Sequence, residues 1–192
     1  MFDTHAHLNF PQLLEQIDAV VEQSKKAGLI GIIIASSNLE DSKKAIELAG
    51  EFSGFLWASV GIHPQKTDVK NQDSVREQLS QLEQLIKENK EIVKAVGETG
   101  MDFSPAPQGE ENRTEKDQRE FFLGQINLAL KYDLPLIVHA RKANDEVIEI
   151  LQTKTLNLKP ETKLSGVFHC YSGGKKKGPK SFRFTRGLVF WS

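Results

Sequence analysis

The chain has 192 residues, of which 39% are hydrophobic and 27% are charged, with a formal net charge of −1. This length fits one domain, and the composition is typical of a soluble globular protein. A membrane span and a secretory signal are not expected, because no run of about 18 apolar residues is present and the first residues lack a basic stretch before an apolar one. Cys170 is the only cysteine, which excludes an internal disulfide and fits a reducing compartment.

The charge is unevenly distributed along the chain. Residues 162–192 contain seven basic residues and no acidic one, so the rest of the chain carries a net charge of −8. This distribution indicates either a basic tail that binds nucleic acid or an end of the chain that did not evolve under the same selection as the rest.

Short apolar runs alternate with longer amphipathic patterns. Six runs rich in Val, Ile or Phe are expected to be strands, at residues 2–4, 29–35, 55–61, 91–96, 134–138 and 166–168. Their nearly continuous apolar character is typical of parallel strands buried on both faces. Spacings of three and four residues predict helices at 13–21, 39–49, 75–86, 115–132 and 146–151. Gly28 and Gly50 are expected to end the first two helices, and Ser74 to cap the third.

The order of these elements is β-α-β-α throughout, with about six units. Such an order predicts an α/β fold with a parallel sheet and right-handed crossovers. Periodicity alone leaves two architectures open, a TIM-type (β/α)8 barrel and a doubly wound sheet.

Ionisable residues lie at or just after the ends of the predicted strands. They are His5 and His7 after the first strand, His63 after the third, Glu98 after the fourth, His139 after the fifth and His169 after the sixth. In a (β/α)8 barrel these strand ends converge on the face where active sites are built. The pattern therefore predicts that residues far apart in the chain meet in one site.

His5 and His7 alternate along an extended segment, so both imidazoles are expected on one side, where they could bind one divalent ion. A chance pair is the alternative for such a short motif, but five histidines on one face favour a metal site. Glu98 lies directly after a buried strand, where a carboxylate is costly unless it binds something, such as two cations at once. Its alternative is a helix cap or a solvent-facing acid.

Four further residues have candidate roles beside this site. Asp3 and Asp102 could orient ligand histidines or cap turns. Arg141, two residues after His139, would face the same side and suits phosphate binding, unless it forms a surface ion pair. The thiol of Cys170 is expected to point away from its neighbour, as alternate side chains in a strand do.

Five motifs together resemble successive signatures of the TatD family. They are residues 2–8 (FDTHAHL), 61–64 (GIHP), 97–102 (GETGMD), 138–141 (VHAR) and 169–173 (HCYSG). The resemblance covers the chain from Phe2 to about Gly174. It implies a TIM barrel of the amidohydrolase-like group and a cytoplasmic deoxyribonuclease, often a 3′ exonuclease, that needs divalent cations such as Mg²⁺.

The resemblance also implies roles for individual residues. His5 and His7 would bind one metal, Glu98 would bridge two, and His139 and His169 would serve the second. His63 would lie beside the scissile phosphate, where it binds substrate or transfers a proton; Glu98 and His63 are thus the expected catalytic residues. A water activated by the cations would attack phosphorus in line. The histidine-rich ligand set suits Mn²⁺ or Zn²⁺ as well as Mg²⁺.

The match ends near residue 175. The family's barrel has two further strands, and the last carries a metal-binding aspartate, whereas this sequence has no Asp after Asp145. We therefore expect a TatD-like barrel at 1–174, incomplete at its end, followed by a basic divergent tail at 175–192. No stable protein partner is expected.

Three functions are compatible with this sequence. The first is a metal-dependent deoxyribonuclease with DNA as its substrate. The second is another hydrolase of the same superfamily, which would cleave a neutral amide or ester and show little dependence on salt. The third is an inactive nucleic-acid-binding remnant, which would lose binding if residues 175–192 were removed.

Overall fold

The computed structural model describes residues 1–67, 72–106, 108, 113–159 and 162–170. The basic segment 175–192 and the last residues of the 169–173 motif lie outside the described residues. The strands are β1 (Phe2–Ala6), β2 (Gly31–Ile34), β3 (Leu56–Val60), β4 (Val93–Asp102), β5 (Leu136–Arg141) and β6 (Gly166–His169). The helices are α1 (Pro11–Leu14), α2 (Ile17–Lys26), α3 (Leu39–Glu51), the 3₁₀ turn η1 (Pro64–Lys66), α4 (Gln72–Glu88), α5 (Glu115–Tyr132) and α6 (Asn144–Leu156).

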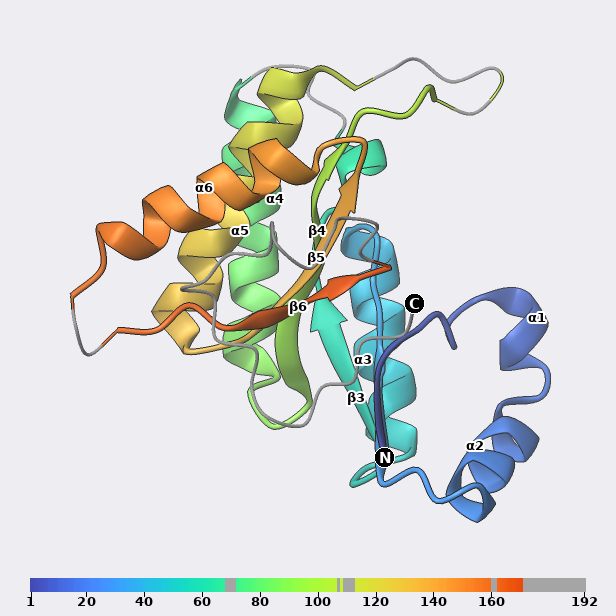
Figure 1. Cartoon of the computed structure of the whole chain (residues 1–192). Helices are drawn as coiled ribbons and strands as arrows, with labels where there is room; N and C mark the ends of the chain where they lie inside the picture. The colour runs from blue at the N-terminus through green and yellow to red at the C-terminus, as the bar shows by residue number, and fades with distance from the viewer. Residues whose placement is uncertain (68–71, 107, 109–112, 160–161, 171–192) are drawn as a thin grey trace.

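The six strands form one parallel sheet in the order β1-β2-β3-β4-β5-β6 (Figure 1). Each strand pairs with the next one in the chain, and the order never reverses. A doubly wound sheet would need a reversal, so the structure excludes it, and this order is that of a (β/α) barrel. The predicted α/β fold is therefore confirmed.

The two faces of the sheet are apolar for different reasons. On the outer face, strand residues such as Ile34, Leu56 and Val138 pack against the helices in one large cluster. On the inner face, the strand residues pack on one another within the described part of the chain. This second cluster contains Ile33, Ala95 and Ile137, with Phe2, Trp57 and Val167 packed against them. Alternation along each strand thus buries both faces, as the continuous apolar runs predicted.

Three helix boundaries differ from the sequence prediction. The first helical pattern is two helices, because Pro11 starts the short α1 and α2 begins only at Ile17. Gly28 follows α2 with φ +85°, which confirms its role in ending that helix. Gly50 lies inside α3, and α4 begins before Ser74, so neither is a boundary. No helix among the described residues is long and apolar enough to cross a membrane.

Strand β4 is longer than predicted, and this places Glu98 inside the strand rather than after it. Glycines conceal the extension, since they are rare in strands. Here they let β4 run close to β5. A Cβ on Gly97 would lie 2.6 Å from the carbonyl oxygen of Ile137, and one on Gly100 would lie 2.0 Å from that of His139. Only residues without a side chain fit this contact.

Candidate metal centre

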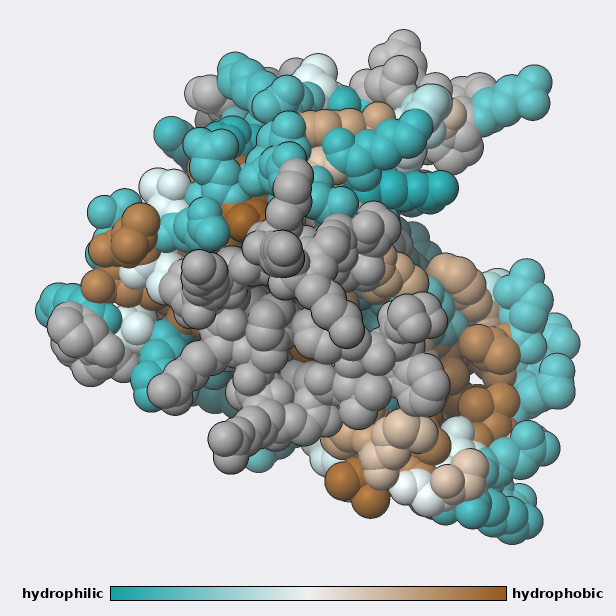
Figure 2. All heavy atoms as spheres, in the orientation of Figure 1, coloured by the Kyte–Doolittle hydropathy of each residue, from teal (hydrophilic) through white to brown (hydrophobic). Residues whose placement is uncertain are grey.

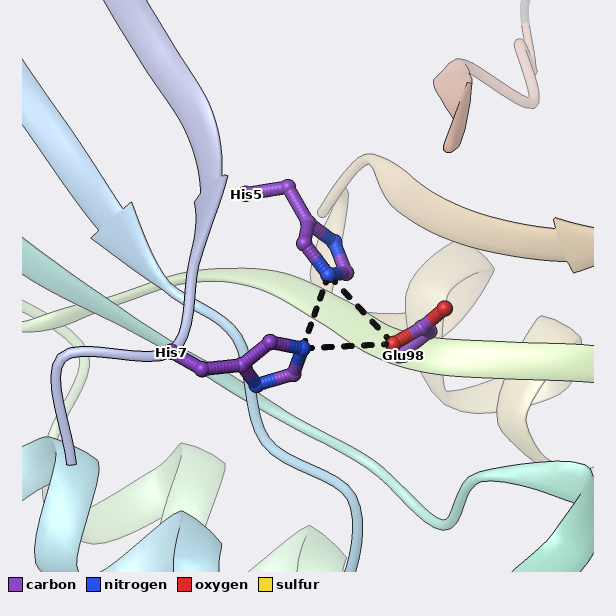
Figure 3. Close-up of side chains that lie close together, drawn as sticks. All are labelled: His5, His7 and Glu98. Carbon is purple, nitrogen blue, oxygen red and sulfur yellow. Dashed lines mark hydrogen bonds and ion pairs between the residues drawn. The ribbon is translucent and has the colours of Figure 1, made fainter. Parts of the chain in front are cut away.

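The five histidines and Glu98 meet at the carboxyl ends of the strands. They come from β1, β4, β5 and β6 and from the loop after β3. His5 and His7 point from β1 and its end toward Glu98 of β4, as the sequence pattern predicted (Figure 3).

An irregularity in β4 aims Glu98 into the site. In the pairing with β5, Gly97 lies opposite Ile137 and Thr99 opposite Val138, so Glu98 is an extra residue in its strand. Such bulges redirect a side chain and are frequent beside active sites. The backbone N–H of Glu98 donates to the carbonyl of Ser36 at the end of β2, at 2.8 Å. Glu98 is only 4% exposed, so its carboxylate is fixed and largely removed from water.

The two oxygens of Glu98 face two different sets of histidines. Oε2 lies 3.4 Å from Nε2 of His5 and 4.0 Å from Nε2 of His7. Oε1 lies 2.8 Å from Nδ1 of His139 and 3.9 Å from Nε2 of His63. One carboxylate therefore joins two groups of nitrogen atoms, each of which could hold a cation together with it.

Asp102 also contacts this centre. Its Oδ2 lies 3.0 Å from Nε2 of His139, so His139 is held between two carboxylates. Burial lowers the pKa of His139, but its hydrogen bonds and ion pairs with Glu98 and Asp102 outweigh burial and raise it. Asp3 lies within β1, where its carboxylate accepts the backbone N–H of His5 at 3.0 Å.

Burial lowers the pKa of three other histidines. It lowers the pKa of His5 to about 3 and that of His63 to about 4, against the pull of Glu98. Burial also lowers the pKa of His169. For Glu98, burial opposes ionisation, but the hydrogen bond with His139 and the neighbouring imidazoles lower its pKa to about 2. At neutral pH Glu98 is therefore ionised and His5, His63 and His169 are neutral, the forms that bind metal ions.

The spacing of these atoms fits a divalent cation. Two nitrogen ligands, each about 2.1 Å from one ion, lie roughly 3.0–3.4 Å apart at octahedral to tetrahedral angles. Nε2 of His5 and Nε2 of His7 are 3.1 Å apart, and Oε2 of Glu98 is 3.4 Å from the first of them. The third distance, from Oε2 of Glu98 to Nε2 of His7, is 4.0 Å and requires a wider angle at the ion. The mixed nitrogen and oxygen set suits Mn²⁺ or Zn²⁺, and Mg²⁺ with additional water.

A pocket of about 460 Å³ opens over the centre. It is lined by His7, His63, Glu98, His139, Ala140, Arg141, His169 and Cys170. Arg141 lies on the pocket side, as its spacing from His139 predicted. The prediction for Cys170 was wrong, because the residue has φ +48° beyond the strand end and its Sγ lies 3.2 Å from Nε2 of His169. His169 stacks on His5, with ring centroids 3.5 Å apart.

Two buried glutamines support the centre, and the sequence analysis missed both. Gln118 accepts the backbone N–H of Asp102 at 2.7 Å and donates to its carbonyl at 2.9 Å. Gln125 does the same for Ile62, at 2.8 and 3.1 Å, and so fixes the segment that carries His63. They lie two turns apart in α5, on one face of the helix. That spacing on an apolar face was the available signal.

The family model for "TatD related DNase" matches residues 2–188, nearly the whole chain. This chain belongs to the TatD family. The "Uncharacterized metal-dependent hydrolase YabD" of Bacillus subtilis is 32% identical over 191 residues, which are 99% of this chain and 68% of that protein. The "3'-5' ssDNA/RNA exonuclease TatD" of Pectobacterium carotovorum is 30% identical over 91% of this chain.

Solved TatD structures share the fold. The TatD homolog YJJV of Escherichia coli superposes with a TM-score of 0.76 and 28% identity over 92% of this chain. The chain spans 62% of that structure and 61% of the Pectobacterium exonuclease.

Proposed function

We propose that this protein is a divalent-cation-dependent hydrolase that cleaves phosphodiester bonds in DNA, as an exonuclease. One observation carries the proposal: the buried carboxylate of Glu98 divides its two oxygens between two sets of histidines. This arrangement is what a carboxylate shared by two cations requires. The names of the TatD relatives, which include a single-stranded DNA and RNA exonuclease, supply the substrate class.

The residues divide the work as follows in this proposal. His5, His7 and Glu98 would hold one cation. Glu98 and His139 would hold a second, which His169 would also serve. Such cations would supply Lewis-acid chemistry to the phosphate and to the water that attacks it.

The chain's own groups position the substrate. Arg141 reaches the pocket from the end of β5, where a guanidinium can make paired hydrogen bonds to a phosphate. His63 has a depressed pKa and is neutral at pH 7. Its Nδ1 accepts the backbone N–H of Gln65 at 3.1 Å, so its Nε2 carries the proton and can donate a hydrogen bond to the phosphate. DNA is the proposed partner and the cytoplasm the proposed location, since the lone Cys170 forms no internal disulfide.

The test compares the protein with Glu98→Gln, which keeps the shape but removes the charge. End-labelled single-stranded DNA is incubated with Mg²⁺ or Mn²⁺, and cation binding is measured by calorimetry. We expect the variant to lose at least about a hundredfold in rate and to bind cations more weakly, since even indirect changes at metal sites cost 10- to 100-fold. Glu91→Gln is the control, because the Glu91 side chain is 99% exposed.

Two outcomes contradict the proposal. Undiminished cleavage by Glu98→Gln would remove Glu98 from the chemistry. Cleavage of a neutral ester in preference to DNA, without dependence on salt, would favour the other hydrolases of the superfamily.

The roles of His63 and His169 are separated by a second pair of variants. In the described part of the chain, His63 lies with Glu98 and His139 in a possible ligand group. If His169 is the ligand and His63 acts on the phosphate, His169→Asn weakens cation binding while His63→Asn mainly reduces cleavage. The reverse result would assign the second cation to His63.

A further inference from the structure

An apolar surface adjoins the metal centre at the loop after β1. Phe10 is 44% exposed, and its ring stacks on that of His7, with centroids 4.8 Å apart and planes inclined by 15°. Leu13 and Leu14 of α1 follow it, 36% and 38% exposed, and no residue of α1 is buried. Figure 2 shows apolar surface in the region of α1. We call Phe10, Leu13 and Leu14 the apolar platform.

The platform is held in place by its own backbone. The N–H of Phe10 donates to the carbonyl of His7 at 3.1 Å. The carbonyl of Phe10 accepts the N–H groups of Leu13 and Leu14 at 2.9 and 3.0 Å. Pro11 fixes the first helical position, where its missing N–H costs nothing. A ring that is already ordered loses little conformational entropy when a ligand covers it.

The platform continues the pocket rather than standing apart from it. His7 lines the pocket with one edge, where its Nε2 faces Glu98, and stacks on Phe10 with its ring face. A ligand that reaches from the cation-binding groups across His7 therefore passes directly onto Phe10. Such a ligand needs an anionic group at one end and a flat apolar group next to it.

We propose that the apolar platform binds a nucleobase of a single-stranded nucleic acid, in a nucleotide next to the phosphate that is cleaved. The proposal rests on the function proposed above and adds a base-binding subsite to it. A nucleotide joins a phosphate to a flat aromatic base, which matches the order of surfaces from Glu98 to Phe10. In single strands the bases are free to stack on aromatic side chains, and such stacking tolerates any sequence.

The proposal is tested by removing the two stacking partners separately and together. The full chain, Phe10→Ala and Phe10→Trp are titrated with short, uncleavable phosphorothioate oligonucleotides in the presence of Mn²⁺. A parallel series carries one abasic nucleotide, moved along the strand. Leu156→Ala is the control, because Leu156 is an exposed apolar residue at the end of α6 (82% exposed), an element well separated from α1 in Figure 1.

We expect Phe10→Ala to weaken binding by about 5- to 100-fold, as the loss of one base stack does, and Phe10→Trp to retain it. At one position, an abasic nucleotide should weaken binding to the unaltered protein by a similar factor. The same abasic nucleotide should not weaken binding to Phe10→Ala any further. The slope of log Kd against log salt should stay the same, since no phosphate contact is lost. Mn²⁺ affinity should not change.

Each contrary result has a separate meaning. If the unaltered protein binds and cleaves DNA but Phe10→Ala binds equally well, or loses the same factor at every abasic position, the base-binding subsite is overturned while the proposed function stands. If Phe10→Ala lowers Mn²⁺ affinity as much as DNA affinity, Phe10 acts only by supporting His7. If the unaltered protein with Mn²⁺ neither binds nor cleaves any oligonucleotide, the proposed function itself is overturned.

Discussion

In β5, Ile137 packs against Ile33 and Ala95 on the inner face of the sheet, whereas His139, two residues further along that face, contacts Glu98 and Asp102. The same change occurs in β6 between Val167 and His169. The middle of each strand therefore stabilises the sheet, and its carboxyl end carries ionisable groups. On one face of each of these two strands, the packed residue and the ionisable residue are therefore only two positions apart.

Substitution of Ile137, in the middle of β5, should have the largest effect on the stability of the fold. Ile137 is 2% exposed, so Ile137→Ala should lower the free energy of unfolding by about 2–5 kcal/mol through lost burial and a residual cavity. Urea denaturation measures this. Glu98→Gln is the counterpart and should lose cation affinity, whereas folded Ile137→Ala should keep it. Loss of cation affinity in folded Ile137→Ala would show that the two regions are not separate.

The buried glutamines of α5, Gln118 and Gln125, connect the apolar middle of the sheet with the strand ends. Their substitution should have an intermediate effect on stability. Gln125→Ala leaves the buried N–H and carbonyl of Ile62 without partners, which costs about 1–3 kcal/mol. Because His63 follows directly, KM for DNA should rise as well. Gln84→Ala is the matched control, since the hydrogen bond from Gln84 to Glu88 is exposed. Loss of stability with unchanged KM would mean that Gln125 supports the fold and not the site.

The smallest expected effect is on pH dependence, where stability and cation affinity should change in opposite directions. Because the pKa of His139 is raised in the folded protein, its contribution to stability is present at low pH and is lost as the pH rises through that pKa. Cation affinity should change the other way. A cation displaces the proton, so affinity falls about tenfold for each pH unit below the pKa of His139.

Calorimetric titration with Mn²⁺ at several pH values, together with urea denaturation of the metal-free protein, measures both trends. His139→Gln should reduce the slope of log Kd against pH by about one. Stability and cation affinity that fall together with pH would contradict this account of His139.

The sequence predicted that the five histidines and Glu98 would meet at the strand ends, because histidines after short apolar runs identify strand ends without any knowledge of the sheet. It could not predict that Glu98 lies inside β4. That placement depends on a close approach of two backbones, which Gly97 and Gly100 permit but no local propensity reveals. Gln118 and Gln125 were missed for a related reason. Glutamine is an ordinary helix residue, and its partner here is the backbone of a distant strand.

The stacking of His169 on His5 has a consequence for how the protein forms. Every strand pairs with its predecessor, so the sheet can grow in the order of synthesis through contacts of modest sequence separation. The two rings, however, come from the first and the last described strands. Cation binding should therefore be among the last events of folding. The rate at which tight Mn²⁺ binding appears after dilution from urea would measure the rate at which folding is completed.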